Sequence, residues 1–136
     1  MFERAYLIEL KSQKTDSGVL TIVDGHPFQP QRAFWIEGLK KDSVRGNHAH
    51  RELKQLVICM EGHLLADILT PNDVEHTTFA MDSVNNRYLY VPPMNWLGIC
   101  YCEIETKILV LADAPYDELD YIRSFDEFKS YGSTIQ

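Results

Sequence analysis

Long apolar segments are missing from this sequence. No run approaches the roughly 18 consecutive apolar residues that suggest a helix crossing a membrane. The first residues, MFERAYLIELKSQ, place Glu3, Arg4 and Glu9 where a secretory signal peptide needs an uninterrupted apolar core. We therefore expect a cytoplasmic protein that does not associate with a membrane.

Cysteine is scarce, with three residues in a chain of 136. Cys100 and Cys102 lie two residues apart in a strand-like stretch, which is poor geometry for a disulfide framework. The sequence has neither a Cys-x-x-Cys pair nor a Cys/His cluster with the spacing of a zinc finger. The cysteines are therefore expected to be reduced thiols, and a structural zinc site is not expected.

Positive charge is also in short supply. The net charge of −7 at pH 7 argues against nonspecific binding to nucleic acid or to an anionic membrane. Residues 31–54 differ, because they carry a local charge of +3 while the rest of the chain carries −10. The basic residues of this segment are Arg32, Lys40, Lys41, Arg45, Arg51 and Lys54. Two interpretations stay open: a site for a small anionic ligand, and a chance clustering of charge on a solvated surface.

What the sequence does contain is a series of short β-rich runs. Val, Ile, Tyr, Phe and Thr dominate these runs, and Gly, Pro, Asn and Asp close them, which is typical of strands and turns. The runs are AYLIEL, VLTIVDG, RAFWIEG, QLVICMEG, LLADILTPND, VEHTTFAM, RYLYVPP and TKILVLADAP. Short strands at regular spacing favour a sandwich or barrel, and the chain length suits one domain. We predict a single all-β domain over residues 1–136.

The residues after Pro115 have a different pattern. In YDELDYIRSFDEFKSY, four apolar residues recur at three-residue steps, namely Leu119, Ile122, Phe125 and Phe128. This spacing is compatible with one or two short helical turns that pack on the barrel. A short helical cap at the C-terminal end is therefore expected.

Two histidines stand close together in the stretch RGNHAHREL. Residues i and i+2 of a strand share a face, so His48 and His50 are expected side by side, with Asn47 and Ala49 facing the other way. Such a pair fits a metal site or an acid/base pair. It also fits two polar side chains on the wet face of an edge strand.

The spacing around this pair resembles the first motif of the cupin superfamily. Gln55 stands where a metal-binding cupin normally has a glutamate, and Gly62 completes the motif. The second cupin motif overlies PPMNWLG, where Gly98 takes the place of the last histidine ligand. Two imidazoles and a carboxamide would hold a divalent metal far more weakly than a set that includes a carboxylate. The remaining chemistry of two imidazoles is proton transfer near neutral pH.

At this point the sequence resembles one family in particular, the metal-free cupins known as dTDP-sugar 3,4-ketoisomerases. The matching segments are SGVLTIVDGHPFQPQRAFWI, RGNHAHRELKQLVICMEG, YLYVPPMNW and LVLADAPYDELDYIRSFDEF. The resemblance implies a cupin jelly-roll barrel without a cofactor. It also implies a reaction that moves the keto group of a dTDP-4-keto-6-deoxy-hexose from C4 to C3 through an enediol, in deoxyamino-sugar biosynthesis for surface polysaccharide. A homodimer, possibly with exchanged N-terminal strands, is implied as well.

The resemblance also implies roles for individual residues. His48 and His50 are the expected acid/base residues, with His50 favoured as the base at carbon and no metal ligands. The expected substrate-binding residues are Arg32, Arg45, Asn47, Gln55, Tyr90 and Trp96. Ser17 stands where the family often has an arginine, so the identity of the sugar stays open. Phe34 and Trp35 occupy positions often filled by tyrosine.

Two other functions remain as alternatives. One is a metal-dependent cupin oxygenase or isomerase, and the other is a noncatalytic module that binds a sugar nucleotide. A role in binding DNA is poorly supported, because the sequence has neither a basic helix nor an overall positive charge.

Overall fold

The burial of side chains alternates along strands that form the body of the molecule. A computed structural model describes residues 1–38, 44–101 and 105–133 of the chain. In β11 (Lys107–Ala112), every second side chain is buried, and β7 (His63–Leu69) shows the same alternation. Side chains of a strand point alternately to its two faces, so each of these strands presents an apolar face to a core.

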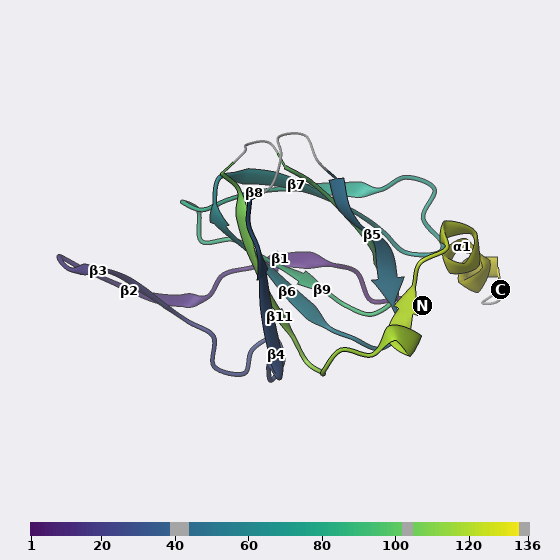
Figure 1. The fold of residues 1–136 in the computed structure, drawn as a ribbon, viewed down its shortest axis with the longest axis horizontal. Coiled ribbons are helices and arrows are strands. Elements are labelled where there is room, and N and C mark those ends of the chain that lie inside the picture. Colours follow the sequence, from purple (N-terminus) through teal and green to yellow (C-terminus); the bar gives the residue numbers. More distant parts are fainter. Residues whose placement is uncertain (39–43, 102–104, 134–136) are drawn as a thin grey trace.

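Two five-stranded antiparallel sheets form the body of the molecule (Figure 1). The first has the order β1 (Tyr6–Ile8), β9 (Tyr88–Val91), β6 (Gln55–Glu61), β11, β4 (Arg32–Ile36). The second has the order β12 (Tyr121–Ile122), β5 (Val44–His50), β10 (Trp96–Tyr101), β7, β8 (Thr77–Asp82).

The main core lies between the two sheets. It draws Val57 of β6 and Val110 of β11 from the first sheet, and Leu64 of β7 and Leu97 of β10 from the second. A second cluster, which includes Leu56 and Tyr90, covers the opposite face of the first sheet. Neighbouring residues of one strand therefore belong to different clusters, and the alternation decides which residues can reach the space between the sheets.

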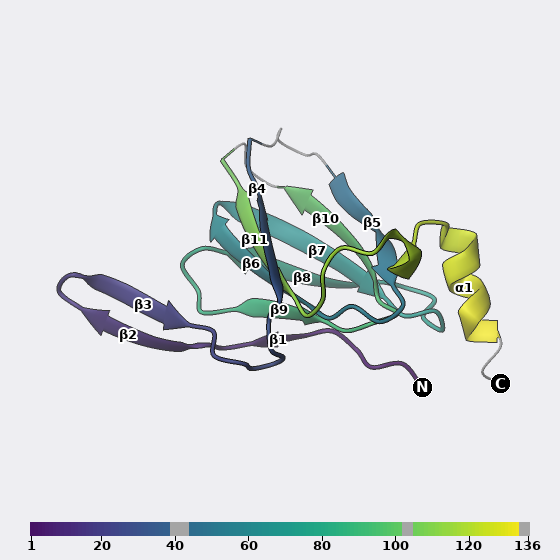
Figure 2. The same ribbon diagram turned by 60° about the horizontal axis from the view of Figure 1, so that its bottom comes forward.

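One hairpin stands apart from the two sheets. β2 (Lys11–Thr15) and β3 (Gly18–Ile22) pair only with each other among the described residues. The hairpin extends away from the body of the molecule in both views (Figures 1 and 2). Its apolar side chains Val19 and Leu20 are 63% and 57% exposed. An isolated two-stranded hairpin is marginally stable in water, so this one is expected to gain stability from another surface.

The C-terminal residues form three short elements rather than a uniform cap. The 3-10 helix η1 (Glu118–Asp120) leads directly into β12, and the helix α1 (Phe125–Ser133) follows. Ile122 and Phe128 are fully buried, whereas Leu119 is 84% exposed. The three-residue spacing thus predicted the helix and the burial of Ile122 and Phe128 correctly. It did not predict that Ile122 belongs to a strand of the second sheet.

The jelly-roll prediction is confirmed, since the architecture is mostly β with one short C-terminal helix. All eight β-rich runs contain strands. No helix within the described ranges is long and apolar enough to span a membrane. Lys40 and Lys41 of the basic segment and Cys102 lie outside the residues that the structure describes.

Candidate active site

A β-bulge in β5 brings three predicted site residues to one face. Gly46 and Asn47 have positive φ values of 86° and 58°, and the pairing with β10 shifts by one residue there. The shift leaves Arg45 opposite Ile99 and His48 opposite Leu97. Both partners belong to the core between the sheets. The extra residue of the bulge therefore places Arg45 on the same face as the histidines, which simple alternation would have prevented.

His48 and His50 lie side by side, as the i, i+2 spacing predicted. Their ring centroids are 5.1 Å apart and the rings meet edge to face. His50 is only 5% exposed. Its ring centroid lies 4.3 Å from that of Tyr121, the residue of β12 that pairs with His50 of β5. Tyr121 also lies 5.0 Å from the ring of His48. The two imidazoles and this phenol form a compact cluster on the inner face of the second sheet.

The two ring nitrogens of His50 have different environments. Nδ1 lies 3.0 Å from Oδ2 of Asp120. Nε2 is buried and has no hydrogen-bond partner among the described residues. A buried polar atom without a partner is costly, so this nitrogen is suited to receive a group from a bound ligand.

Burial sets the protonation of both histidines. The pKa of His50 falls from 6.5 to about 4, chiefly because of burial and then because of the nearby His48, while Asp120 opposes the shift. Burial also lowers the pKa of His48, against a hydrogen bond to the backbone of Gly46 that raises it. Both imidazoles are therefore neutral at pH 7, the form that accepts a proton.

Arg32 and Gln55 lie on the two strands that flank β11 in the first sheet. Both are paired with Ala112 at the same end of β11. Gln55 is buried and shares a face of β6 with the core residue Val57. Arg32 stacks on Phe34 at 5.2 Å, its Nε is buried without a hydrogen-bond partner in the described chain, and its charge lowers the pKa of His50. The structure thus places a half-buried cation near His50 and a buried carboxamide on the face of β6 that points into the core between the sheets.

Three other predicted residues are not brought to the histidines. Tyr90 faces the opposite side of the first sheet, where it packs on Tyr6 at 5.3 Å and donates a hydrogen bond to Glu3. Trp96 packs on Phe128 of α1 at 5.4 Å. Asn47 lines a groove on the outer side of the second sheet together with Trp96. The alternation along β9 and β10 turns these aromatic side chains away from the core between the sheets.

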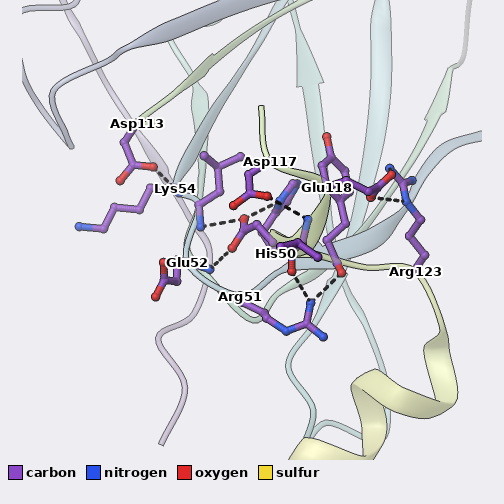
Figure 3. Close-up of polar contacts among 12 residues, drawn as sticks. His50, Arg51, Glu52, Lys54, Asp113, Asp117, Glu118 and Arg123 are labelled. Atoms are coloured by element: carbon purple, nitrogen blue, oxygen red, sulfur yellow. Dashed lines mark hydrogen bonds and ion pairs between the residues drawn. The ribbon is translucent and has the colours of Figure 1, made fainter. Parts of the chain in front are cut away.

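Residues of the C-terminal segment were not predicted as part of the site. Asp120 and Tyr121 contact His50, and Arg123 lies 4.1 Å above the ring of Tyr121 while it pairs with Glu118 (Figure 3). The segment DELDYIR lies in one of the stretches that carry the family resemblance, but its apolar spacing predicted only short helical turns that cap the barrel. The pairing of β12 with β5 makes it part of the site.

His48 and His50 have side chains that bind metals in other proteins. Within the described ranges, however, no group of three or more His, Cys, Asp or Glu side chains is arranged to hold a metal ion. His50 has a carboxylate beside one ring nitrogen, and its other ring nitrogen is buried without a hydrogen-bond partner among the described residues, which suits a proton-transfer group.

The comparison with known proteins identifies the family. The family model described as "FdtA: WxcM-like, C-terminal" matches residues 3–133. The chain belongs to this family. One relative is a protein of Aneurinibacillus thermoaerophilus described as a TDP-4-oxo-6-deoxy-alpha-D-glucose-3,4-oxoisomerase. It is 34% identical to this chain over 109 residues, which cover 80% of this chain and 76% of the relative.

Solved structures agree with the fold of this WxcM-like protein. The sugar 3,4-ketoisomerase QdtA of Thermoanaerobacterium thermosaccharolyticum, in complex with TDP, superposes with a TM-score of 0.89 at 30% identity over 98% of both chains. A variant of that enzyme, with asparagine in place of a histidine, was solved in complex with TDP-4-keto-6-deoxyglucose and also has a TM-score of 0.89, at 29% identity over 99% of this chain and 98% of that one. These are the proteins to which this chain is similar.

Proposed function

We propose that this protein is a TDP-sugar 3,4-ketoisomerase that acts in the cytoplasm through histidine acid/base catalysis. The observation that carries the proposal is the state of His50, a buried neutral imidazole whose Nε2 has no partner among the described residues and whose Nδ1 meets a carboxylate. The relatives described as 3,4-ketoisomerases support the substrate class, a TDP-linked 4-keto-6-deoxy sugar.

The reaction needs two proton shifts and no net change in oxidation state. The C3 hydrogen is acidic because it is adjacent to the C4 carbonyl, so neutral His50 removes it as a proton while the C4 oxygen gains one. The product of this step is an enediol with a double bond between C3 and C4. Loss of the proton from the C3 hydroxyl then forms the C3 carbonyl, and C4 takes up a proton. His48, with its ring 5.1 Å from that of His50, is placed to serve the two oxygens.

Arginine and amide side chains supply the polar contacts for the nucleotide sugar. Arg45 lies on the same face of β5 as the histidines and is exposed, so its guanidinium is available to the diphosphate. Arg32 is half-buried and acts electrostatically on His50, and Gln55 is buried on the core side of β6, so both are proposed to hold the oxygens of the hexose. Tyr121 covers the histidine rings and offers an aromatic surface to the sugar.

The protein is expected to be a homodimer built through its β2–β3 hairpin. The hairpin leaves the body of the molecule with Val19 and Leu20 exposed, and a second copy is the partner that would pair its edges and cover these side chains. Light scattering is expected to give twice the chain mass, and Leu20→Glu is expected to shift the population toward monomer. A wild-type mass of 15.7 kDa at every concentration contradicts the dimer.

Incubation with dTDP-4-keto-6-deoxyglucose in deuterated water tests the reaction. NMR is expected to show a 3-keto product with deuterium at C4, and His50→Asn is expected to abolish its formation. His76→Asn is the matched control, because His76 is an exposed histidine that faces Asp67 away from the pair. Three outcomes would contradict the proposal. A product with altered configuration at C5 would indicate an epimerase, activity that chelators abolish would indicate a metal-dependent enzyme, and binding without turnover would indicate a noncatalytic module.

A further inference from the structure

Asp120 has an unusually complete set of hydrogen bonds for a carboxylate near a surface loop. Its Oδ1 accepts from the backbone N–H of Glu52 at 2.8 Å, and its Oδ2 accepts from the N–H of Leu53 at 3.3 Å. Oδ2 also meets Nδ1 of His50 at 3.0 Å. Both oxygens therefore accept hydrogen bonds, and an ionised carboxylate is an acceptor at every lone pair.

The state of the carboxylate decides the state of the ring. Because ionised Asp120 only accepts, Nδ1 of His50 must carry the hydrogen of their shared bond. The neutral ring then has its lone pair on Nε2, the atom that is buried and has no partner in the described chain. We propose that Asp120 is a positioning residue that fixes His50 as the Nδ1–H tautomer and so turns Nε2 toward the proton of the sugar carbon.

The chain around Asp120 is anchored on both sides. Nη1 of Arg51 donates to the carbonyl of Leu119 at 3.1 Å and to that of Tyr121 at 2.7 Å, so it holds the residues before and after Asp120 (Figure 3). The N–H of Arg51 donates to the carbonyl of Asp120 itself at 2.9 Å. A ring held by a carboxylate that is itself fixed has little freedom to rotate, as a proton-transfer group requires.

The charged and titratable groups around His50 come from four elements. They are His48 on β5, Arg32 on β4, Asp120 on η1 and Tyr121 on β12. His48 and Arg32 lower the pKa of His50 together with burial, and Asp120 raises it. Removal of the carboxylate charge therefore lowers the pKa of His50 further, which makes the imidazole a weaker base as well as a less well oriented one.

Asp120→Asn separates this role from that of a loop anchor. An asparagine that keeps the 2.8 Å bond from Glu52 with its oxygen presents its NH₂ group to Nδ1, and this favours the opposite tautomer, with hydrogen on Nε2. Asp113→Asn is the matched control. Asp113 accepts from the N–H of Lys54 at 2.9 Å in the same β5–β6 connection and has no recorded contact with His50.

Two measurements test the proposal, which rests on the proposed function. In steady-state kinetics with dTDP-4-keto-6-deoxyglucose, we expect kcat of Asp120→Asn to fall on the order of 100-fold, because general base catalysis contributes about that much. KM is expected to stay within about threefold of the wild-type value. The acid limb of the pH profile is expected to move to lower pH. Asp113→Asn is expected to keep kcat within about twofold of wild type.

The second measurement needs no substrate, and its wild-type arm does not depend on the folding of a variant. Long-range ¹H–¹⁵N NMR of wild-type protein at pH 7 is expected to show His50 neutral with hydrogen on Nδ1, and on Nε2 in Asp120→Asn. A wild-type ring that is charged or carries hydrogen on Nε2 overturns the proposal, as do unchanged kinetics in Asp120→Asn or equal losses in both variants. If wild-type protein leaves the keto sugar unchanged, the proposed function fails, and the NMR result still decides the role of Asp120.

Discussion

Gly46 is the position where the site depends most directly on a missing side chain. A Cβ atom at this residue would lie 2.6 Å from the carbonyl oxygen of Leu97, and the φ of +86° is one that L-residues rarely adopt. The bulge that this glycine permits puts Arg45 and His48 on one face of β5. Gly46→Ala therefore perturbs both stability and the arrangement of the site.

The size of the effect follows from two separate costs. A left-handed backbone costs an alanine about 1 kcal/mol, and overpacking against a fixed carbonyl costs about 2 kcal/mol more. Gly38→Ala is the control, since Gly38 has a φ of +73° but nothing within 4 Å of its Cβ position. The free energy of unfolding is therefore expected to fall by about 3 kcal/mol in Gly46→Ala and by about 1 kcal/mol in Gly38→Ala.

Urea unfolding at fixed protein concentration measures both values, because a dimer makes apparent stability depend on concentration. Turnover measured on the same samples is expected to fall more than tenfold in Gly46→Ala, since loss of the bulge moves one of the site residues to the other face of the strand. Equal destabilisation of the two variants, or full activity in Gly46→Ala, would refute the account of the bulge.

Three further outcomes follow from the site. As pH falls from 6.5 to 4, the unfolded chain binds a proton at His50 that the folded protein, with its pKa of about 4, does not. Stability should therefore drop across this window by roughly 3 kcal/mol, and His50→Asn should lose this dependence in urea titrations at several pH values. Arg32→Gln should raise KM about tenfold with little change in kcat, because it removes a contact made equally in the ground state and the transition state; a lowered kcat with constant KM argues for a contact made only in the transition state. Trp96→Ala should lower the free energy of unfolding by about 3 kcal/mol but leave KM unchanged, since Trp96 packs on Phe128 rather than beside the histidines. A raised KM would indicate that Trp96 contacts the substrate.

Side-chain alternation explains which site residues were found from the sequence. The i, i+2 spacing placed His48 and His50 on one face, and the structure agrees, because a strand repeats every two residues wherever it is regular. Tyr90 and Trp96 were grouped with them by resemblance alone. The alternation of their own strands sends them to the outer clusters, and only the order of strands in the sheets reveals this.

The sequence by itself determined the strand-rich architecture, the C-terminal helix and the pair of neighbouring imidazoles, since these depend on local periodicity and turn chemistry. Only the tertiary structure decided that Arg45 joins them through a bulge, that Arg32 approaches His50 from another sheet, and that Asp120 bonds to His50. Asp120 and His50 are separated by 70 residues. Their contact depends on β12 pairing with β5, and no local pattern in the sequence encodes a pairing between two strands so far apart.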